Sequence, residues 1–254
     1  MNTDFSNYIN TKDVSFIHIG KCGGTKIEIL FAPFGQRVHL GRPRKFKNYV
    51  IWIRNPFNRF ISAFNQSWCL VNLDWSHIKN PNLENCIEPF CITIANRRKK
   101  KHIFPNDYAK LISFFETPNK LAEGLSSEDK NIKENAIKLM NHNTEHIFKG
   151  LAYYLDDGKF IDNNKDKILF VGRVEYMNED IKKISKIFNK NYSEKELNEV
   201  VRKQKWLTDK KHFHLSELAI ENLKLFFKKE FLVIDKLYDY NFIDKKTRDE
   251  YKKF

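Results

Sequence analysis

The chain has 254 residues, of which 41% are hydrophobic and 14% aromatic, and its formal net charge is +13. A chain of this length and apolar content can bury a full core, so disorder along its whole length is excluded. The charge favours anionic partners such as nucleotides or acidic glycans, although Lys beside abundant Asn, Ile and Phe is equally typical of an AT-rich coding bias.

The N-terminal residues contain no apolar run, and no stretch approaches the roughly 18 apolar residues that cross a bilayer. We therefore expect no signal peptide, no membrane span and a cytoplasmic protein, unless an anchor has been removed. The four cysteines, Cys22, Cys69, Cys86 and Cys91, are too few for a disulfide framework and too irregularly spaced for a zinc site.

Residues 14–64 show the alternation of strand, helix, strand and helix that is typical of a parallel α/β sheet. A short apolar strand leads into the glycine turn Gly20-Lys21-Cys22-Gly23-Gly24-Thr25, an amphipathic helix follows to Phe31, and a second strand covers Tyr49 to Ile53. Asn55 can cap the next helix and Pro56 suits its first turn. One buried face of that helix is predicted from Phe57, Phe60, Ile61 and Phe64.

The rest of the chain is more helical. Residues 65–110 are aromatic and irregular, and helical patterns dominate residues 108–150. A third strand is expected from Lys167 to Val171, and the helix after it buries Met177, Ile181, Ile184 and Phe188. Ser193 and Glu196 form a capping box, and one long amphipathic helix begins at Ser216. We expect one α/β domain covering residues 1–254.

Two positions suit an anion. The glycine turn is expected to offer the N–H groups of residues 22–25 at a helix N-terminus, with the Thr25 hydroxyl and Lys21 beside them. Because the lysine precedes the glycines, the turn does not fit a Walker-A loop. Arg54 ends the second strand and Ser62 follows two helical turns later, so a planar fork and a hydroxyl can hold one phosphate. Together they indicate a ligand with two separated anionic groups.

These motifs resemble those of sulfotransferases that use 3′-phosphoadenosine 5′-phosphosulfate (PAPS). FIHIGKCGGTK is similar to their 5′-phosphosulfate loop, commonly H-I-P-K-T-G-G-T-S, and IRNPFNRFISAF to their 3′-phosphate motif, commonly R-D-P-x-x-R-x-x-S-A-Y. ILFVGRVEYMNEDI and HLSELAIENLKLFFKKEFLVIDKLY resemble the late strand and closing helix. The resemblance is strongest to the Golgi-type and bacterial carbohydrate sulfotransferases (family 2-like), and it covers most of the chain except a divergent segment, about residues 65–140.

The resemblance implies a P-loop-like central parallel sheet flanked by helices, with PAPS as the donor. It implies a carbohydrate or glycan acceptor, and neither a metal nor a nucleic-acid partner. Separately, the net charge of +13 is a weak indication that the acceptor is acidic. The implied donor-binding residues are Lys21, Cys22, Gly23, Gly24, Thr25, Lys26, Arg54 and Ser62. The sequence departs from the family at Gly20, Cys22, Lys26 and Asn55, where proline, threonine, serine and aspartate are usual. Lys26 would add a phosphate contact, and Cys22 would make the site sensitive to oxidation.

Sulfuryl transfer needs a group that stabilises developing charge and a base that takes the proton of the acceptor hydroxyl. Lys21 is the candidate for the first role. His39 is the candidate base, because related enzymes place a catalytic His or Glu after the first helix, and Glu28 is a weaker substitute. A strand histidine that faces solvent or the core is the alternative for His39.

Other interpretations stay open. The chain suits a non-catalytic basic protein that binds anionic polysaccharide or nucleic acid on the same fold, and a nucleotide kinase is disfavoured by the position of Lys21. His142-Asn143-Thr144-Glu145-His146 matches the H-x-x-E-H pattern of inverted zinc proteases, which needs a helix. A basic loop with Lys203, Lys205, Trp206, Lys210 and His212-Phe213-His214 suggests a lid over the nucleotide, or simply a solvated loop.

Overall fold

The computed structural model describes residues 9–38, 45–72, 104–144, 146–199 and 209–254. The chain divides into two compact units. Unit 1 contains Met1–Arg59, Lys149–Val201 and Lys224–Phe254, and unit 2 contains Phe60–Phe148 and Arg202–Leu223. Helix α2 (Pro56–Asn72) begins in unit 1 and continues in unit 2. The single domain expected for residues 1–254 stays a prediction.

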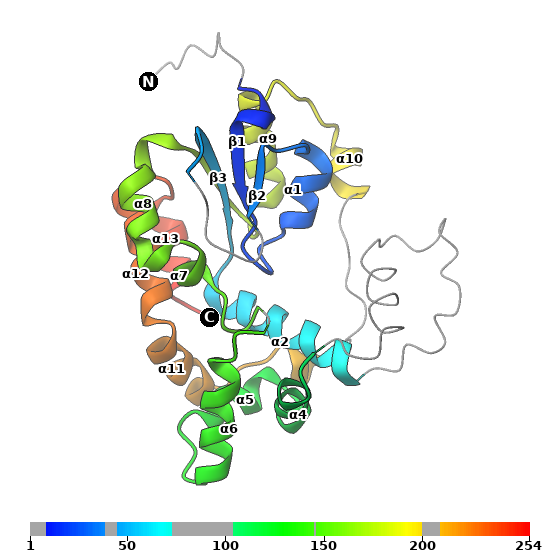
Figure 1. Ribbon diagram of the computed structural model, residues 1–254, viewed down its shortest axis with the longest axis vertical. Helices are drawn as coiled ribbons and strands as arrows, with labels where there is room; N and C mark the ends of the chain where they lie inside the picture. Colours follow the sequence, from blue (N-terminus) through cyan, green and yellow to red (C-terminus); the bar gives the residue numbers. More distant parts are fainter. Residues whose placement is uncertain (1–8, 39–44, 73–103, 145, 200–208) are drawn as a thin grey trace, which may run out of the picture. The chain divides into compact units, whose positions relative to one another are not determined.

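The described part of unit 1 is built on a parallel sheet of four strands in the order β2-β1-β3-β4 (Figure 1). The strands are β1 (Val14–Ile17), β2 (Gln36–Val38), β3 (Asn48–Ile53) and β4 (Ile168–Arg173). Ile17 of β1 lies opposite Val38 of β2 on one side and opposite Ile51 of β3 on the other. The predicted α/β class with a central parallel sheet flanked by helices is confirmed.

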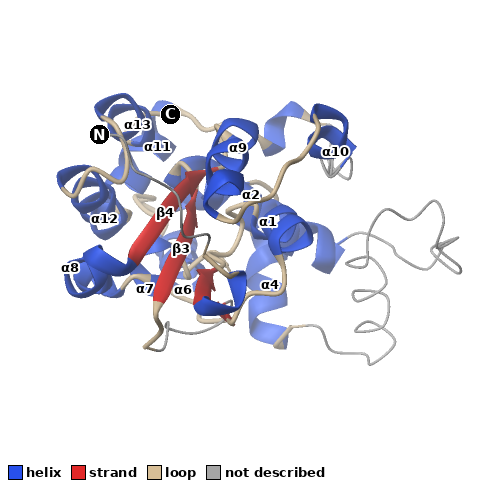
Figure 2. Cartoon of the chain, turned by 90° about the horizontal axis from the view of Figure 1, so that it is seen from above, coloured by secondary structure: helices blue, strands red, loops and turns tan. Residues whose placement is uncertain are grey.

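Helices cover both faces of this sheet. Helices α1 (Gly24–Phe31) and α9 (Met177–Ile187) pack on one face, while α7 (Leu151–Tyr154), α8 (Lys159–Asn164) and α12 (Lys228–Asp239) pack on the other (Figure 2). Residues 49–53 are consequently buried on both sides, and for that reason this strand is a continuous apolar run in the sequence. Unit 1 also contains α10 (Glu194–Glu199) and α13 (Lys245–Tyr251).

The predicted helix starts are confirmed in atomic detail. The Asn55 side-chain oxygen accepts the N–H groups of Phe57 and Asn58 at 3.0 and 3.3 Å, which caps α2. At the start of α10, the hydroxyl of Ser193 accepts the N–H of Glu196 at 3.3 Å, and the carboxylate of Glu196 accepts the N–H of Ser193 at 2.7 Å. Both caps satisfy donors that a helix start leaves open.

The single long helix expected from Ser216 is wrong. Two helices, α11 (Glu217–Phe226) and α12, are separated at Phe227, whose φ of −87° and ψ of 17° leave the helical region. The apolar period continues across this break, since Leu223, Phe227 and Ile234 are all buried. Periodicity therefore gave no signal of the interruption. Strand β2 was not predicted, because it is only three residues long.

Unit 2 contains α4 (Asn106–Phe114), α5 (Pro118–Gly124) and α6 (Lys130–Met140), and α6 packs against both of the others. The chain leaves α6 at Met140, so His142 and His146 lie outside any helix rather than one turn apart on one. The helical zinc-protease geometry is therefore wrong for this segment, although Glu145 lies outside the described residues. His142 instead contacts the carboxylate of Asp107 at 3.2 Å.

Among the described residues, no helix has the length and apolar character required to cross a bilayer. The same residues contain no group of three or more His, Cys, Asp or Glu side chains placed to hold a metal ion.

Candidate anion-binding site

The carboxyl ends of β1 and β3 lie side by side where the chain changes direction across the sheet. From β1 the chain passes through α1 to β2 on one side, and then returns to β3 on the other side. In open parallel sheets, ligands bind beyond the carboxyl ends of the strands at such a switch point. The glycine turn, residues 20–25, follows β1 and Arg54 follows β3. The glycine turn and Arg54 are therefore both at this switch point.

The glycine turn leaves backbone donors at the start of α1. Gly23 caps the helix with a left-handed backbone, φ 70°. The N–H groups of Gly23, Gly24 and Thr25 have no acceptor in the part of the chain that the structure describes. The N–H of Cys22 donates to the carbonyl of Ile19 at 3.1 Å, so this group is used by the turn itself. A helix start with open N–H groups attracts an anion through these donors and the helix dipole.

Lys21 holds a strained position in this turn. Its φ of 70° lies in the left-handed region, which costs a residue with a Cβ about 1–2 kcal/mol. Such outliers concentrate at binding and catalytic sites, where the surrounding structure maintains them. The carbonyl oxygen of Lys21 accepts a hydrogen bond from Nη1 of Arg54 at 3.2 Å. The two motifs, 33 residues apart in the sequence, are thus in direct contact.

Arg54 is a partly buried cation whose hydrogen-bond donors are only partly satisfied. Its Nε is buried without a hydrogen-bond partner, and burial lowers the pKa of its guanidinium. No described carboxylate forms an ion pair with it. A desolvated charge with an unsatisfied donor is costly unless an anion completes it. The guanidinium and the open N–H groups of the turn therefore form one candidate site for an anionic ligand.

Asn55 and Glu175 fix the backbone next to Arg54. The Glu175 carboxylate accepts the N–H of Asn55 at 3.1 Å and the hydroxyl of Tyr251. The Asn55 side-chain nitrogen donates to the carbonyls of Glu250 and Lys253 at 3.1 and 2.9 Å. An aspartate cannot donate, so asparagine at this position ties the C-terminal residues to the start of α2. The departure at Asn55 therefore has a structural role that the motif alone did not indicate.

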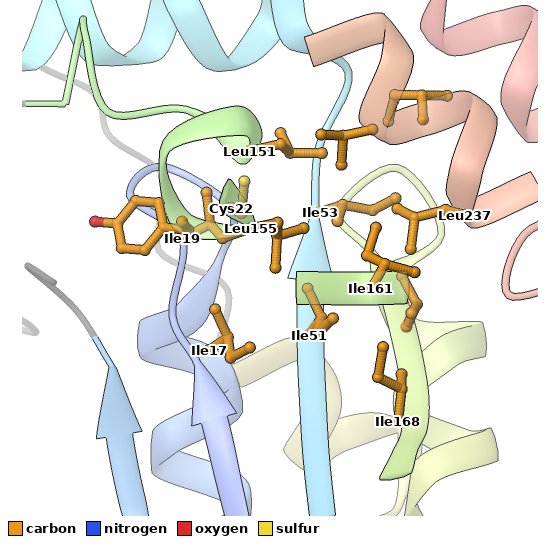
Figure 3. Close-up of a cluster of buried hydrophobic side chains, with 14 of the residues drawn as sticks. Ile17, Ile19, Cys22, Ile51, Ile53, Leu151, Leu155, Ile161, Ile168 and Leu237 are labelled. Atoms are coloured by element: carbon orange, nitrogen blue, oxygen red, sulfur yellow. The ribbon is translucent and has the colours of Figure 1, made fainter. Parts of the chain in front are cut away.

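Cys22 is not a reactive part of the site. Its side chain is fully buried and belongs to the apolar cluster that includes Ile19, Leu151 and Leu155 (Figure 3). Burial raises the pKa of the thiol to about 12, so almost no thiolate exists at neutral pH. The expected sensitivity to oxidation is therefore wrong. Cys22 contributes neither its N–H nor its sulfur to an anion, and it anchors the turn to the core.

The phosphate contact expected of Lys26 is also wrong. The ammonium group donates to the side-chain oxygen of Asn178 at 3.0 Å and to the carbonyl of Leu197 at 2.6 Å. The side chain is buried and burial lowers its pKa. Two neutral oxygens, one on α9 and one on α10, thus accept hydrogen bonds from the ammonium group that was expected to contact a phosphate. Its N–H donates to the carbonyl of Gly23 at 3.1 Å.

A polar cluster that sequence reasoning missed lies on the other flank of the turn. Nδ1 of His18 is 2.9 Å from a carboxylate oxygen of Glu28, and Arg37 of β2 forms an ion pair with the same oxygen. Burial raises the pKa of Glu28, but the hydrogen bond from His18 and the charges of His18 and Arg37 outweigh it and lower the pKa overall. Glu28 is therefore a poorer base than the sequence suggested. Only the position of His18, three residues before Lys21, gave a signal.

The remaining predicted residues are placed as follows. Thr25 is exposed at the helix start, and Ser62 is partly buried on the part of α2 that belongs to unit 2, so its action with Arg54 stays a prediction. His212 is buried, with its ring 5.1 Å from that of Trp68, so the lid expected there is wrong for this residue. The candidate base His39 lies outside the described residues, as do Lys203, Lys205 and Trp206.

Compared with known proteins, the chain matches no protein-family model, no curated protein and no solved structure. Its function is therefore argued from the chemistry of this site.

Proposed function

We propose that this protein is a sulfotransferase that moves the sulfuryl group of PAPS to a hydroxyl of a carbohydrate or glycan acceptor. The observation that carries the proposal is Arg54, a partly buried guanidinium with a buried, unsatisfied Nε, which contacts the glycine turn through the carbonyl of Lys21. PAPS carries one anionic group on each side of its ribose. Such a ligand matches one arginine and one set of backbone donors on neighbouring strands.

The described residues divide into two binding roles. The N–H groups of Gly23, Gly24 and Thr25 would hold the 5′-phosphosulfate at the start of α1. The planar fork of Arg54 would hold the 3′-phosphate, with the Ser62 hydroxyl as a second donor. Neither role uses the side chain of Cys22 or Lys26, which are directed into the protein.

The proposed transfer step follows from the chemistry of sulfuryl transfer. The acceptor oxygen attacks sulfur in line, the bond from sulfur to the bridging phosphate oxygen breaks, and adenosine 3′,5′-bisphosphate leaves. The hydroxyl proton passes to a base, for which His39 stays the candidate. Lys21, at the edge of the turn, would stabilise the negative charge that grows on the departing oxygens. The +13 charge of the chain favours an acidic acceptor.

Thermal unfolding with nucleotides tests the donor site. We expect adenosine 3′,5′-bisphosphate to raise the Tm more than 5′-AMP or ATP. At ~100 times its Kd a ligand adds about 2.7 kcal/mol, which is a shift of several degrees for a chain of this size. Arg54→Ala should reduce the shift, while Lys12→Ala, which removes an exposed lysine in unit 1, should leave it unchanged.

The same experiment separates the two function classes. A Tm shift of the same size with and without the 3′-phosphate, or one that Arg54→Ala does not reduce, would contradict the proposal. It would favour a basic protein that binds polyanions without catalysis. A specific shift leads to an activity assay, in which release of adenosine 3′,5′-bisphosphate from PAPS is measured with neutral and acidic oligosaccharides as acceptors.

A further inference from the structure

The imidazole of His18 is built into the first turn of α1. His18 is buried, and its backbone N–H donates to the carbonyl of Val38 at 2.8 Å, which fixes the residue at the end of β2. A Cβ placed on Gly24 would lie 2.1 Å from Cδ2 and 2.2 Å from Nε2 of the ring. The ring is therefore packed directly on Gly24, whose N–H is one of the open donors of the site.

The orientation of this ring is set by Glu28, one helical turn after Gly24. Nδ1 of His18 lies 2.9 Å from the carboxylate of Glu28, which only accepts hydrogen bonds, and 3.3 Å from Nη2 of Arg37, which only donates them. We assign the proton to Nδ1 on the shorter of these two contacts. Arg37 pairs with the same carboxylate and holds it from the side of β2. The ring thus links the end of β1 to Gly24 and Glu28, which lie one turn apart on the same face of α1. His18 and Arg37 thus hold the carboxylate of Glu28 from two directions.

We propose that His18 is a positioning residue of the anion site, which acts through its hydrogen bond to Glu28 to hold the N–H groups of Gly24 and Thr25 in line with the 5′ anion of the ligand. The inference rests on the proposed function, because it names the ligand group that the turn receives. His18 itself does not have to touch the ligand. Losing its hydrogen bond should weaken recognition of the 5′ group and leave recognition of the 3′-phosphate by Arg54 intact.

Two variants separate the hydrogen bond from the packing of the ring. His18→Phe keeps an aromatic ring on Gly24 and loses the bond, whereas His18→Asn keeps a donor near the position of Nδ1 and loses the ring. Affinities for adenosine 3′,5′-bisphosphate and for adenosine 3′-monophosphate are measured by calorimetry. We expect His18→Phe to weaken the bisphosphate about tenfold, the effect of one lost hydrogen bond to a charged group, and to leave the monophosphate unchanged. His18→Asn should restore most of the loss.

Glu28→Ala removes the same hydrogen bond from the helix side and should reproduce the selective loss, which keeps the test valid if His18→Phe does not fold. Equal losses for both nucleotides, or no rescue by His18→Asn, would overturn the role of His18. Arg54→Ala serves as the separate arm, because it should weaken both nucleotides. If wild type does not prefer adenosine 3′,5′-bisphosphate to 5′-AMP, the proposed function and this inference fail together. If Arg54→Ala weakens both nucleotides but the His18 and Glu28 variants bind them like wild type, the inference fails and the proposed function stands.

Discussion

Gly24 shows how one missing methyl group supports the site. A Cβ at this position would lie 2.1–2.4 Å from three atoms of the His18 ring, closer than any real contact. The ring is held by Glu28 and stacks on Phe16, so these contacts oppose a shift of the ring away from Gly24. The small size of Gly24 is thus a requirement of its neighbour, whereas Gly23 is required by its own backbone, with φ 70°.

We therefore expect Gly24→Ala to destabilise the protein by about 1–3 kcal/mol, the usual cost of overpacking, in spite of the better helix propensity of alanine. The double variant Gly24→Ala with His18→Ala should recover part of this loss, because the ring that collides is gone. Urea unfolding of both single variants and the double variant measures the coupling. Additive losses would show that the two residues do not share this contact.

Cys22 gives a second prediction at this scale. The buried thiol, with its pKa raised to about 12, should resist iodoacetamide in the native protein at mildly alkaline pH and react fully in urea. Mass spectrometry of the peptide that contains Cys22 follows the reaction. Rapid labelling of the native protein would mean that the turn opens often enough to expose the thiol. If adenosine 3′,5′-bisphosphate binds the closed turn, as we propose, it should slow any residual labelling.

Among the elements, α7 depends on a carboxylate supplied by α12. Glu230 is buried and accepts the N–H groups of Leu151 and Ala152 at 2.7 and 3.1 Å, which satisfies the first turn of this short helix. Gly150 leaves room for it, because a Cβ there would lie 2.3 Å from the carboxylate. Burial raises the pKa of Glu230 above its ordinary value. The folded protein therefore binds this proton more tightly than the unfolded chain does.

The sign of the pH effect follows from that difference. The contribution of Glu230 to the free energy of unfolding is fully present below its ordinary pKa of about 4.3. It is lost as the pH rises through the higher pKa of the folded state. Glu230→Gln does not titrate, so its free energy of unfolding should fall less steeply than that of wild type from weakly acidic to neutral pH. Urea unfolding at a series of pH values compares the slopes. Identical slopes would show that the carboxylate keeps its ordinary pKa.

The elements differ in how far the sequence could predict them. Local signals were sufficient for α2, where Asn55 caps the helix and Phe57 begins its buried face, and for the turn after β1. The break at Phe227 gave no signal, because the apolar period runs through it. The directions of the Lys26 and Cys22 side chains could not be predicted either. Both are decided by contacts with α7, α9 and α10, far along the chain.

At the scale of the whole molecule, the question is whether the charge or the site selects the ligand. A net charge of +13 attracts any polyanion, and most lysines in the described part of the chain are exposed, such as Lys47 and Lys130. Their fields fall off with the Debye length, which is about 10 Å at 0.1 M salt and about 3 Å at 1 M. Arg54 is different, because it is partly buried and hydrogen-bonded to the turn. Buried contacts are screened much less than exposed ones.

Salt therefore distinguishes the two kinds of binding. We expect affinity for an anionic polysaccharide to fall steeply between about 0.1 and 1 M salt, as counterion release requires. Affinity for adenosine 3′,5′-bisphosphate should fall much less, and its preference over 5′-AMP should persist in high salt, because short contacts to Arg54 and the glycine turn provide it. Calorimetry at both salt concentrations measures this, with Lys130→Ala as a control that changes charge far from any site residue in the sequence. If the preference disappeared with salt, the long-range charge rather than the switch-point site would account for binding.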